Sequence, residues 1–196
     1  MRLKRNGTVR MPSTEELEEE LSRVNGKIRY RKALKNTLFT LITVAALAVL
    51  VSTLWLPVLQ IYGNSMTPTL KAGEILLTVK HSELESGEVV AFYYNNKILV
   101  KRVIANAGEW VDIDPYGNVF VDGRELSEPY LSEPDYGDTN IQLPYQVPDG
   151  KIFVMGDHRE TSLDSRNTAI GCVSEEQIIG KIIFRIWPLS RLGGVE

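Results

Sequence analysis

Residues 37–56 read TLFTLITVAALAVLVSTLWL, a run of 20 residues without a charged side chain. A helix of about 20 apolar residues crosses the roughly 30 Å hydrocarbon core of a bilayer. Immediately before the run stand four basic residues, Arg29, Arg31, Lys32 and Lys35. Trp55 lies near its far end, a position typical of interfacial aromatic residues. The stretch therefore predicts one transmembrane anchor over residues 37–58.

A removable signal peptide is the competing interpretation of this apolar run. The run begins far from the N-terminus and is longer than the ~15-residue apolar region of such peptides. It is also followed by no A-x-A cleavage site. These features favour an uncleaved anchor.

Charge is distributed unevenly along the chain. Residues 1–36 hold ten Lys and Arg against five acidic residues, whereas the net charge of the whole chain is −3. Because basic flanks stay on the inner side of a membrane, we expect a cytoplasmic tail over residues 1–36 and an extracytoplasmic domain over residues 59–196. The protein is then a single-pass protein of the plasma membrane, with the lipid bilayer as a partner. Nothing in the global charge favours nucleic-acid binding.

The tail contains a helix signal of its own. Ser13 followed by Glu16 is a capping box, and acidic residues crowd the first turn. Four apolar residues follow at helical spacing, Leu17, Leu21, Val24 and Ile28. We expect a short amphipathic helix over residues 13–28, which either docks on a partner or on lipid, or remains solvated.

After the anchor the hydrophobic pattern changes to a period of two, which is typical of β-strands. We expect strands at Ile75–Val79, Glu88–Tyr94, Lys97–Ala105, Trp110–Ile113, Val119–Val121, Ile152–Met155 and Lys181–Ile186. Residues 127–150 carry four prolines and little periodicity, which predicts a long exposed loop. The fold class is therefore mainly β, preceded by one transmembrane helix. The single cysteine, Cys172, excludes an intrachain disulfide and is expected to be a small buried side chain.

Residues 63–70 read GNSMTPTL and follow soon after the anchor. Gly63 relieves steric limits on the backbone before Ser65, and Pro68 ends the turn. A glycine-flanked turn of this kind, with Met66 next to the serine, can aim backbone N–H groups at one point, as an oxyanion hole requires. Taken alone, however, the pattern favours an ordinary turn serine.

A serine hydroxyl needs a base to act as a nucleophile. The two histidines of the chain, His81 and His158, lie in no Ser-His-Asp signature, although spacing alone leaves such a triad open. Lysine is the other choice, but its ordinary pKa near 10.4 means that a neutral amine at pH 7 costs roughly 4 to 5 kcal/mol. Burial in apolar surroundings lowers that pKa, so the base should be a lysine on an apolar strand.

Lys101 lies in the middle of the apolar strand over residues 97–105, on the same face as Leu99 and Val103. A strand that is apolar on both sides is buried on both faces. Lys101 is therefore expected to be buried. It is either a functional neutral amine or one half of a buried ion pair.

Residues 156–166, GDHRETSLDSR, follow the apolar strand Ile152–Met155. Turn formers and opposite charges at short range favour a rigid, hydrogen-bonded loop. Asp164 and Arg166 can pair, and Ser162 can bind a neighbouring amine. The composition suits either a salt-bridged structural turn or a support that orients a catalytic base.

Together these segments resemble the bacterial type I signal peptidases. Residues 63–70 resemble the serine box of that family, and residues 86–91 (SGEVVA) resemble its G-D-x-V strand motif. Residues 100–104 (VKRVI) resemble its lysine box, and residues 156–166 its G-D-N-R-x-x-S-x-D-S-R box. The four motifs occur in the same order as in the family, which argues against a chance match.

The resemblance implies a β-rich catalytic domain with an apolar face against the membrane. Its site would be a Ser–Lys dyad with Ser65 as nucleophile and Lys101 as general base. Ser162 would orient the Lys101 amine, and the Ser65 N–H would contribute to the oxyanion hole. The resemblance assigns the support of the loop to Asp157, Asp164 and Arg166.

The resemblance also implies the substrates. They would be secretory preproteins, whose signal peptides bind as an added strand and are cut after small residues of the A-x-A type through an acyl-enzyme. The secretion translocon is a further candidate partner. No metal or organic cofactor is expected.

Two positions depart from the family pattern. Gly63 stands where Gram-negative members often carry a hydroxyl residue as a second oxyanion donor. Together with the single anchor, this indicates the Gram-positive type. His158 stands where the family usually has Asn, but Ser162 and Asp164 are intact, so we expect activity to survive.

Three alternatives stay open at this point. One is a dedicated Ser–Lys peptidase with a single client such as a pilin, which nothing in the sequence separates from the general enzyme. A binding protein without activity would be expected to lose the serine or the lysine, and both are present. A self-cleaving repressor would need a DNA-binding segment, and the membrane anchor also counts against it.

Overall fold

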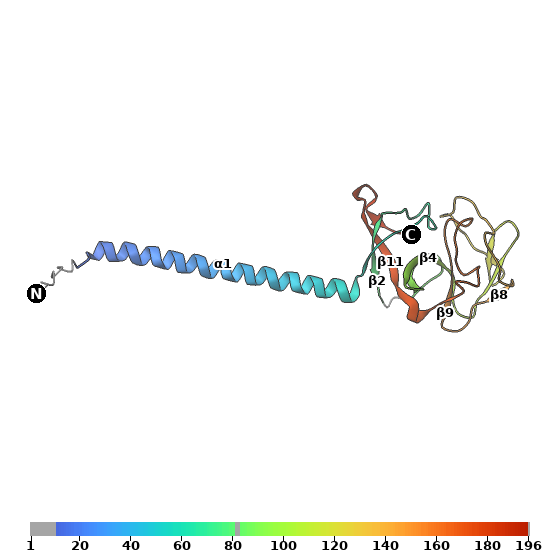
Figure 1. The fold of residues 1–196 in the computed structure, drawn as a ribbon, viewed down its shortest axis with the longest axis horizontal. Coiled ribbons are helices and arrows are strands. Elements are labelled where there is room, and N and C mark those ends of the chain that lie inside the picture. Colours follow the sequence, from blue (N-terminus) through green and yellow to red (C-terminus); the bar gives the residue numbers. More distant parts are fainter. Residues whose placement is uncertain (1–10, 81–82, 196) are drawn as a thin grey trace, which may run out of the picture. The chain divides into compact units, whose positions relative to one another are not determined.

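The computed structural model describes residues 11–80 and 83–195 of the chain, so that His81 lies outside the described residues. The chain divides into two compact units, Met1–Leu50 and Val51–Glu196. The first is helical and the second is built from strands (Figure 1). The predicted class, mainly β with one apolar helix near the N-terminus, is confirmed.

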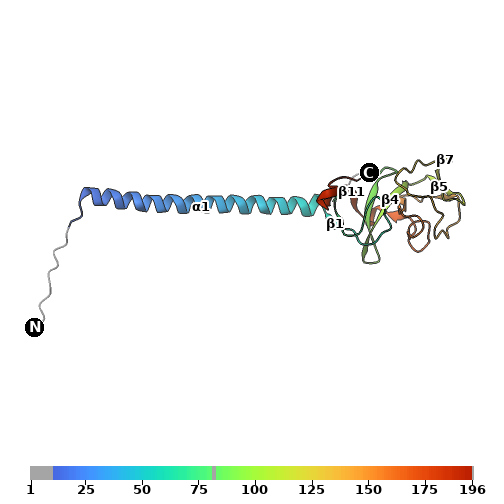
Figure 2. The ribbon, with the colours of Figure 1, turned by 90° about the horizontal axis from the view of Figure 1, so that it is seen from above.

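Helix α1 runs over Thr14–Trp55 as one continuous element of 42 residues (Figure 2). At its start the Ser13 Oγ accepts a hydrogen bond from the Glu16 N–H (3.2 Å), and the Glu16 carboxylate accepts one from the Ser13 N–H (3.0 Å). The predicted capping box is therefore confirmed. At 1.5 Å per residue the helix is about 63 Å long, and the segment Thr14–Ser52 is long and apolar enough to cross a membrane.

One predicted boundary of this region was wrong. The structure shows no break between the predicted helix over residues 13–28 and the apolar run, because residues 29–36 contain no proline and consist mostly of good helix formers. The helix ends at Trp55. Pro57 disfavours helical geometry at the residue before it, and Val58 already belongs to a strand.

The β-rich unit contains two antiparallel sheets. The larger sheet has the order β1, β2, β11, β3, β4, β9, β10, and β12 pairs with β11. Its strands are β1 (Val58–Gln60), β2 (Ile75–Val79), β3 (Val89–Tyr94), β4 (Lys97–Ala105), β9 (Lys151–Met155), β10 (Val173–Ser174), β11 (Ile178–Trp187) and β12 (Gly193–Gly194). Figure 1 shows β2 next to β11 in this sheet, and β4 lies further along it, separated from β11 by β3.

The smaller sheet has the order β7, β6, β5, β8. Its strands are β5 (Trp110–Ile113), β6 (Val119–Val121), β7 (Arg124–Glu125) and β8 (Tyr145–Gln146). All seven predicted strands exist, with ends that shift by up to three residues. The strands that the pattern missed have two or three residues each, too few to show a period of two.

Three clusters of buried apolar residues fill the space around the sheets. The cluster that concerns the site contains Met66 and Leu70, which are 2% and 0% exposed. These two side chains anchor the serine segment in the core, against Leu76 of β2 and Ile182 of β11. The position of Ser65 is therefore fixed by packing on either side of the turn.

As predicted, most residues of the segment over residues 127–150 are exposed. It is irregular apart from β8, but it is not a free surface loop. Val147 is buried, the Tyr130 ring covers the Arg102 guanidinium at 3.8 Å, and Glu128 forms an ion pair with Arg159. The segment thus packs over the motif at residues 156–166.

Candidate active site

The serine segment forms a tight turn. Gly63 has φ = +93°, a left-handed conformation that side-chain-bearing residues rarely adopt, which explains the glycine two positions before Ser65. The Thr67 N–H donates to the Asn64 carbonyl (3.0 Å), and the Leu70 N–H donates to the Met66 carbonyl (2.8 Å). Ser65 itself is half-buried, so its hydroxyl lies at the surface of a rigid support.

The polar groups of Ser65 are available for chemistry. Within residues 11–80 and 83–195, neither the Ser65 hydroxyl nor its backbone N–H forms a hydrogen bond. The Ser65 carbonyl, in contrast, accepts a hydrogen bond from the His158 N–H (3.0 Å). The backbone is therefore held from the carbonyl side while the N–H stays free to bind a developing oxyanion.

Lys101 lies in β4 and is 3% exposed. Its Nζ donates a hydrogen bond to the Ser162 Oγ (3.0 Å), and it forms no ion pair with a carboxylate in the described part of the chain. Burial lowers the pKa of Lys101 from 10.5 to about 8, although the charge of Asp164 acts in the opposite direction. A buried amine with a hydroxyl neighbour is suited to lose its proton near neutral pH, so the alternative of a buried ion pair at Lys101 is wrong.

The predicted burial of this strand on both faces is only half correct. Residues 101–105 are buried, but Ile98 is 44% exposed, and Leu99 and Val100 are half-buried. The reason is that β9 pairs with β4 only from Arg102 onward. The first half of β4 borders open space instead of a neighbouring strand.

The motif at residues 156–166 forms the support of Lys101. The Arg166 guanidinium binds both carboxylate oxygens of Asp164, each at 2.9 Å, and both residues are fully buried. The same guanidinium donates to the carbonyls of Asp135, Tyr136 and Arg159. Asp164 also accepts a hydrogen bond from the Gly156 N–H (2.9 Å), which closes the loop on itself.

Asp164 remains ionised in this setting. Burial raises the pKa of its carboxyl, but the Arg166 guanidinium and the hydrogen bonds from Gly156 and Ser162 outweigh burial, so that the pKa lies below its ordinary value. A Ser162 hydroxyl that donates to Asp164 presents its oxygen lone pair to Lys101. The support loop thereby fixes the direction in which the Lys101 amine points.

Gly156 joins the nucleophile to this support. A Cβ at Gly156 would overlap both the Ser162 Oγ and the Ser65 carbonyl oxygen. The backbone of residue 156 therefore lies between the serine turn and the residue that holds Lys101. Ser65 and Lys101 thus both contact the motif at residues 156–166, Ser65 through its carbonyl and Lys101 through its amine.

Asp157 is positioned differently from the other support residues. It binds the Arg102 guanidinium through both carboxylate oxygens (2.9 and 2.7 Å) and accepts a hydrogen bond from the Thr69 Oγ1 (2.6 Å). Sequence reasoning missed Arg102 and Thr69, because nothing in the spacing of the motifs shows which residues meet across 55 or 88 positions of the chain. Asp157 therefore ties the lysine strand to the serine turn.

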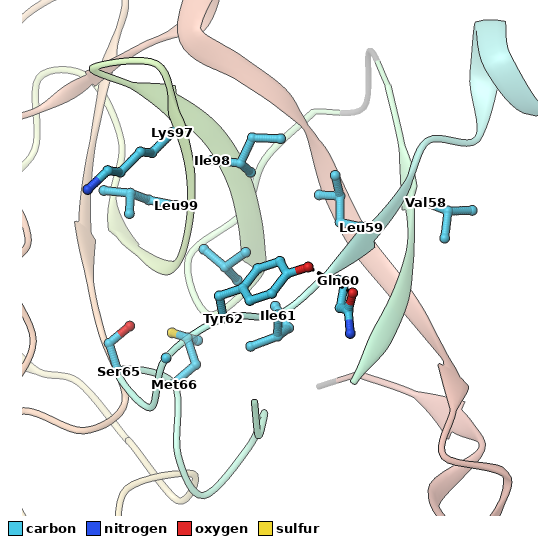
Figure 3. Close-up of a pocket in the computed structure, with 12 residues that line it drawn as sticks. Val58, Leu59, Gln60, Ile61, Tyr62, Ser65, Met66, Lys97, Ile98 and Leu99 are labelled. Carbon is cyan, nitrogen blue, oxygen red and sulfur yellow. Dashed lines mark hydrogen bonds between the residues drawn. The ribbon is translucent and has the colours of Figure 1, made fainter. Parts of the chain in front are cut away.

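A groove opens beside Ser65. It has a volume of about 610 Å³ and is lined by β1, by the segment over residues 61–66, and by the first half of β4. Figure 3 shows Ser65 and Met66 together at one end, Lys97, Ile98 and Leu99 on one side, and Leu59 and Val58 toward the other end. β1 pairs only with β2, and residues 97–101 pair only with β3 among the described strands. Two open strand edges therefore flank the groove.

A serine turn at the end of a strand-lined groove, next to a buried lysine, has the parts of a serine peptidase that binds an extended chain. The chain belongs to the signal peptidase family: the family model described as "Signal peptidase, peptidase S26" matches residues 34–187. It is therefore a serine peptidase hydrolase of the type I signal peptidase class, whose members remove signal peptides from preproteins. The resemblance seen in the sequence is confirmed.

Several known proteins are similar to this chain. Signal peptidase IB of Staphylococcus aureus is 41% identical over 152 residues, which cover 66% of this chain and 77% of that protein. Signal peptidase I of Bacillus amyloliquefaciens is 32% identical over 186 residues, covering 89% and 96%. The crystal structure of a signal peptidase I from Enterococcus faecalis V583 aligns with a TM-score of 0.44 at 27% identity, covering 50% of this chain and 96% of that one.

Proposed function

We propose that Ser65 and Lys101 form the catalytic dyad of this peptidase, and that it cleaves preproteins after small residues of the A-x-A type. The observation that carries the proposal is the setting of Lys101. Its amine is 3% exposed, contacts a serine hydroxyl instead of a carboxylate, and has a pKa lowered to about 8 by burial. A lysine kept in such a place at a cost to stability is expected to be used as a base.

In the proposed mechanism the Ser65 Oγ attacks the scissile carbonyl while the neutral Lys101 Nζ takes the hydroxyl proton. The Ser65 N–H, which has no acceptor in the described structure, stabilises the oxyanion. The tetrahedral intermediate collapses as the Lys101 ammonium returns its proton to the leaving amine, which leaves an acyl-enzyme. Lys101 then takes a proton from water, the hydroxide attacks the ester, and the Ser65 oxygen leaves with that proton.

The groove supports the proposed specificity. An extended substrate placed between β1 and β4 would extend both open edges by main-chain hydrogen bonds, as in β-augmentation. Side chains alternate along a strand, so residues one and three positions before the scissile bond face the same wall. Ile61 and Met66 line the groove beside Ser65, and in this proposal their bulk on that wall favours small side chains at both positions.

We further propose the topology that the sequence predicts. Residues 1–36 form the cytoplasmic tail, residues 37–58 the anchor and residues 59–196 the extracytoplasmic catalytic domain, with lipid and the secretion translocon as partners. The charge of the tail and the length of the apolar helix support this proposal. Protease added to intact cells should digest the region after Leu59 and leave residues 1–36 intact. The reverse digestion pattern would contradict the orientation.

The test of the function uses detergent-solubilised protein, a labelled preprotein with an A-x-A site, and the Ser65→Ala variant as control. The wild-type protein should release a product whose N-terminus, identified by mass spectrometry, follows the second alanine, and Ser65→Ala should release none. Cleavage by both proteins would exclude Ser65 as the nucleophile. Cleavage by neither, with both folded, would favour a dedicated client or a binding role.

A further inference from the structure

The serine turn is held at a point away from the catalytic groups. The Thr69 carbonyl, four residues after Ser65, accepts a hydrogen bond from the Arg185 Nη2 (2.8 Å) and a longer one from the Arg191 Nη2 (3.4 Å). Arg185 lies in β11, and Arg191 ends a short 3-10 turn over Leu189–Arg191. Two side chains from the C-terminal part of the chain therefore converge on the turn that carries Ser65.

The two arginines share one acidic partner. Glu74 is 3% exposed, and its carboxylate forms ion pairs with the Arg185 Nε (2.9 Å) and with the Arg191 Nη1. Glu74 lies shortly after the serine turn in the chain. Its carbonyl accepts a hydrogen bond from the N–H of Ile61, which lies shortly before the turn (2.9 Å). Arg191 thus donates hydrogen bonds to both the Glu74 carboxylate and the Thr69 carbonyl. Arg185 donates to the Thr69 carbonyl, while its Nε lies beside the Glu74 carboxylate as an ion pair without a hydrogen bond.

The additional hydrogen bonds to the Thr69 carbonyl distinguish the cluster from an ordinary ion pair. A guanidinium presents several N–H donors in one plane and can bind two acceptors at a fixed angle, whereas a lysine ammonium acts as a point charge. On its other side, Thr69 is held through its Oγ1 by Asp157 (2.6 Å). The turn is therefore clamped from the support loop by the Thr69 side chain and from the C-terminal segment by the Thr69 carbonyl.

We propose that Arg185, held by Glu74 and assisted by Arg191, is a positioning residue for the nucleophile turn. The inference rests on the proposed role of Ser65 as nucleophile. Loss of the contact to Thr69 allows the turn to shift relative to Lys101. Displacements of about 1 Å in a reacting group cost up to about a hundredfold in rate. Arg185 and Arg191 do not line the groove, so substrate binding stays unchanged.

The test compares Arg185→Lys with Arg191→Gln, and uses Lys181→Gln as the matched control. Lys181 lies on the same strand as Arg185 and forms an ion pair with Glu88, but it does not touch the serine turn. Arg185→Lys keeps the charge next to Glu74 and loses the planar guanidinium. It should lower kcat about tenfold or more, with KM within about twofold of wild type and a closely similar melting temperature. Arg191→Gln, which removes the longer contact, should show a smaller loss of kcat.

Amide hydrogen exchange of the peptide over residues 64–70 gives a readout that does not depend on activity. Exchange should accelerate in Arg185→Lys and not in Lys181→Gln. Unchanged exchange and unchanged kcat in Arg185→Lys would overturn the inference, as would an equal loss of kcat in Lys181→Gln. Failure of the proposed function would be seen in a different measurement, because wild-type protein would then not cleave, or Ser65→Ala would still cleave. The hydrogen-exchange comparison would still test whether Arg185 holds the serine turn.

Discussion

The Nζ of Lys101 donates a hydrogen bond to the Oγ of Ser162 over 3.0 Å, and both side chains are 3% exposed. This contact decides what the lysine can do. A carboxylate in place of the hydroxyl would hold the ammonium form and block its use as a base. A hydroxyl orients the amine without adding an opposite charge.

The first prediction concerns the pH dependence of the rate. With a pKa of about 8, Lys101 is about a tenth neutral at pH 7 and about nine-tenths neutral at pH 9. Because the neutral amine is the base in the proposed mechanism, kcat/KM should rise with pH through about 8 and then level off. Initial rates on a preprotein between pH 6 and pH 10 check this. A rate that does not rise between pH 7 and pH 9 would exclude Lys101 as the base.

The second prediction concerns Ser162, whose hydroxyl accepts the hydrogen bond of the Lys101 amine. Ser162→Ala removes the acceptor that orients the Lys101 amine and leaves the charge of the site unchanged. The loss of one buried hydrogen bond, about 1 to 2 kcal/mol, should lower kcat roughly tenfold or more with little change of KM. Steady-state kinetics beside an exposed-serine control, Ser132→Ala, measure the effect. Wild-type kcat in Ser162→Ala would mean that another group holds the lysine.

The third prediction concerns stability. The native pKa of Lys101 is about 8 against 10.5 for the free side chain, so the unfolded chain binds the proton more tightly. The resulting penalty is fully present below pH 8, amounts to about 3 kcal/mol, and is relieved as pH rises from 8 to 10.5. Lys101→Met should therefore be inactive but more stable at pH 7, by about 2 kcal/mol once the lost hydrogen bond to Ser162 is deducted.

Denaturant unfolding of the wild type and of Lys101→Met at pH 7 and at pH 10.5 tests this stability difference. The advantage of the variant should shrink toward zero at the higher pH. Lys101→Arg provides the matched inactive control, because a guanidinium keeps its proton in both conditions. A variant that is less stable than wild type at pH 7 would show that the lysine is charged and paired.

The fourth prediction concerns Gly156, which lies between the serine turn and Ser162. Gly156→Ala places a methyl group where the Ser162 Oγ and the Ser65 carbonyl already lie, so the turn and the support must move apart. The variant should lose most of its activity, and its melting temperature should fall. Gly194→Ala is the matched control, because its nearest neighbour, the Ile183 carbonyl, lies at an ordinary contact distance of 3.9 Å. Equal activity of both variants would contradict the inferred close packing at Gly156.

Much of this architecture was predictable from local pattern. The long strands, the serine turn with Gly63, the burial of Lys101 and the pairing of Asp164 with Arg166 all follow from residues close together in the chain. The missed strands are too short to carry a period. The continuity of α1 does not follow from the hydrophobic pattern, because a change from charged to apolar residues does not end a helix whose intervening residues are mostly good helix formers.

The contacts that complete the site could not be predicted, because they join distant parts of the chain. Arg102 meets Asp157, Tyr130 covers Arg102, and Arg185 reaches Thr69 across 116 positions. A sequence shows that an arginine is present but not which carbonyl it will bind. Only the order of the strands in the larger sheet brings these partners together.

The open edges of β1 and β4 have a consequence for the range of clients. Under the proposed binding mode, the enzyme would bind the main chain, which is the same in every protein. It would select only for the side chains that point toward Ile61 and Met66. Most positions of a client would then be free to vary without loss of affinity. A requirement for only two small residues on an extended backbone would let one protease cleave many unrelated exported proteins. Folded proteins, which present no extended unpaired segment, would not be cleaved.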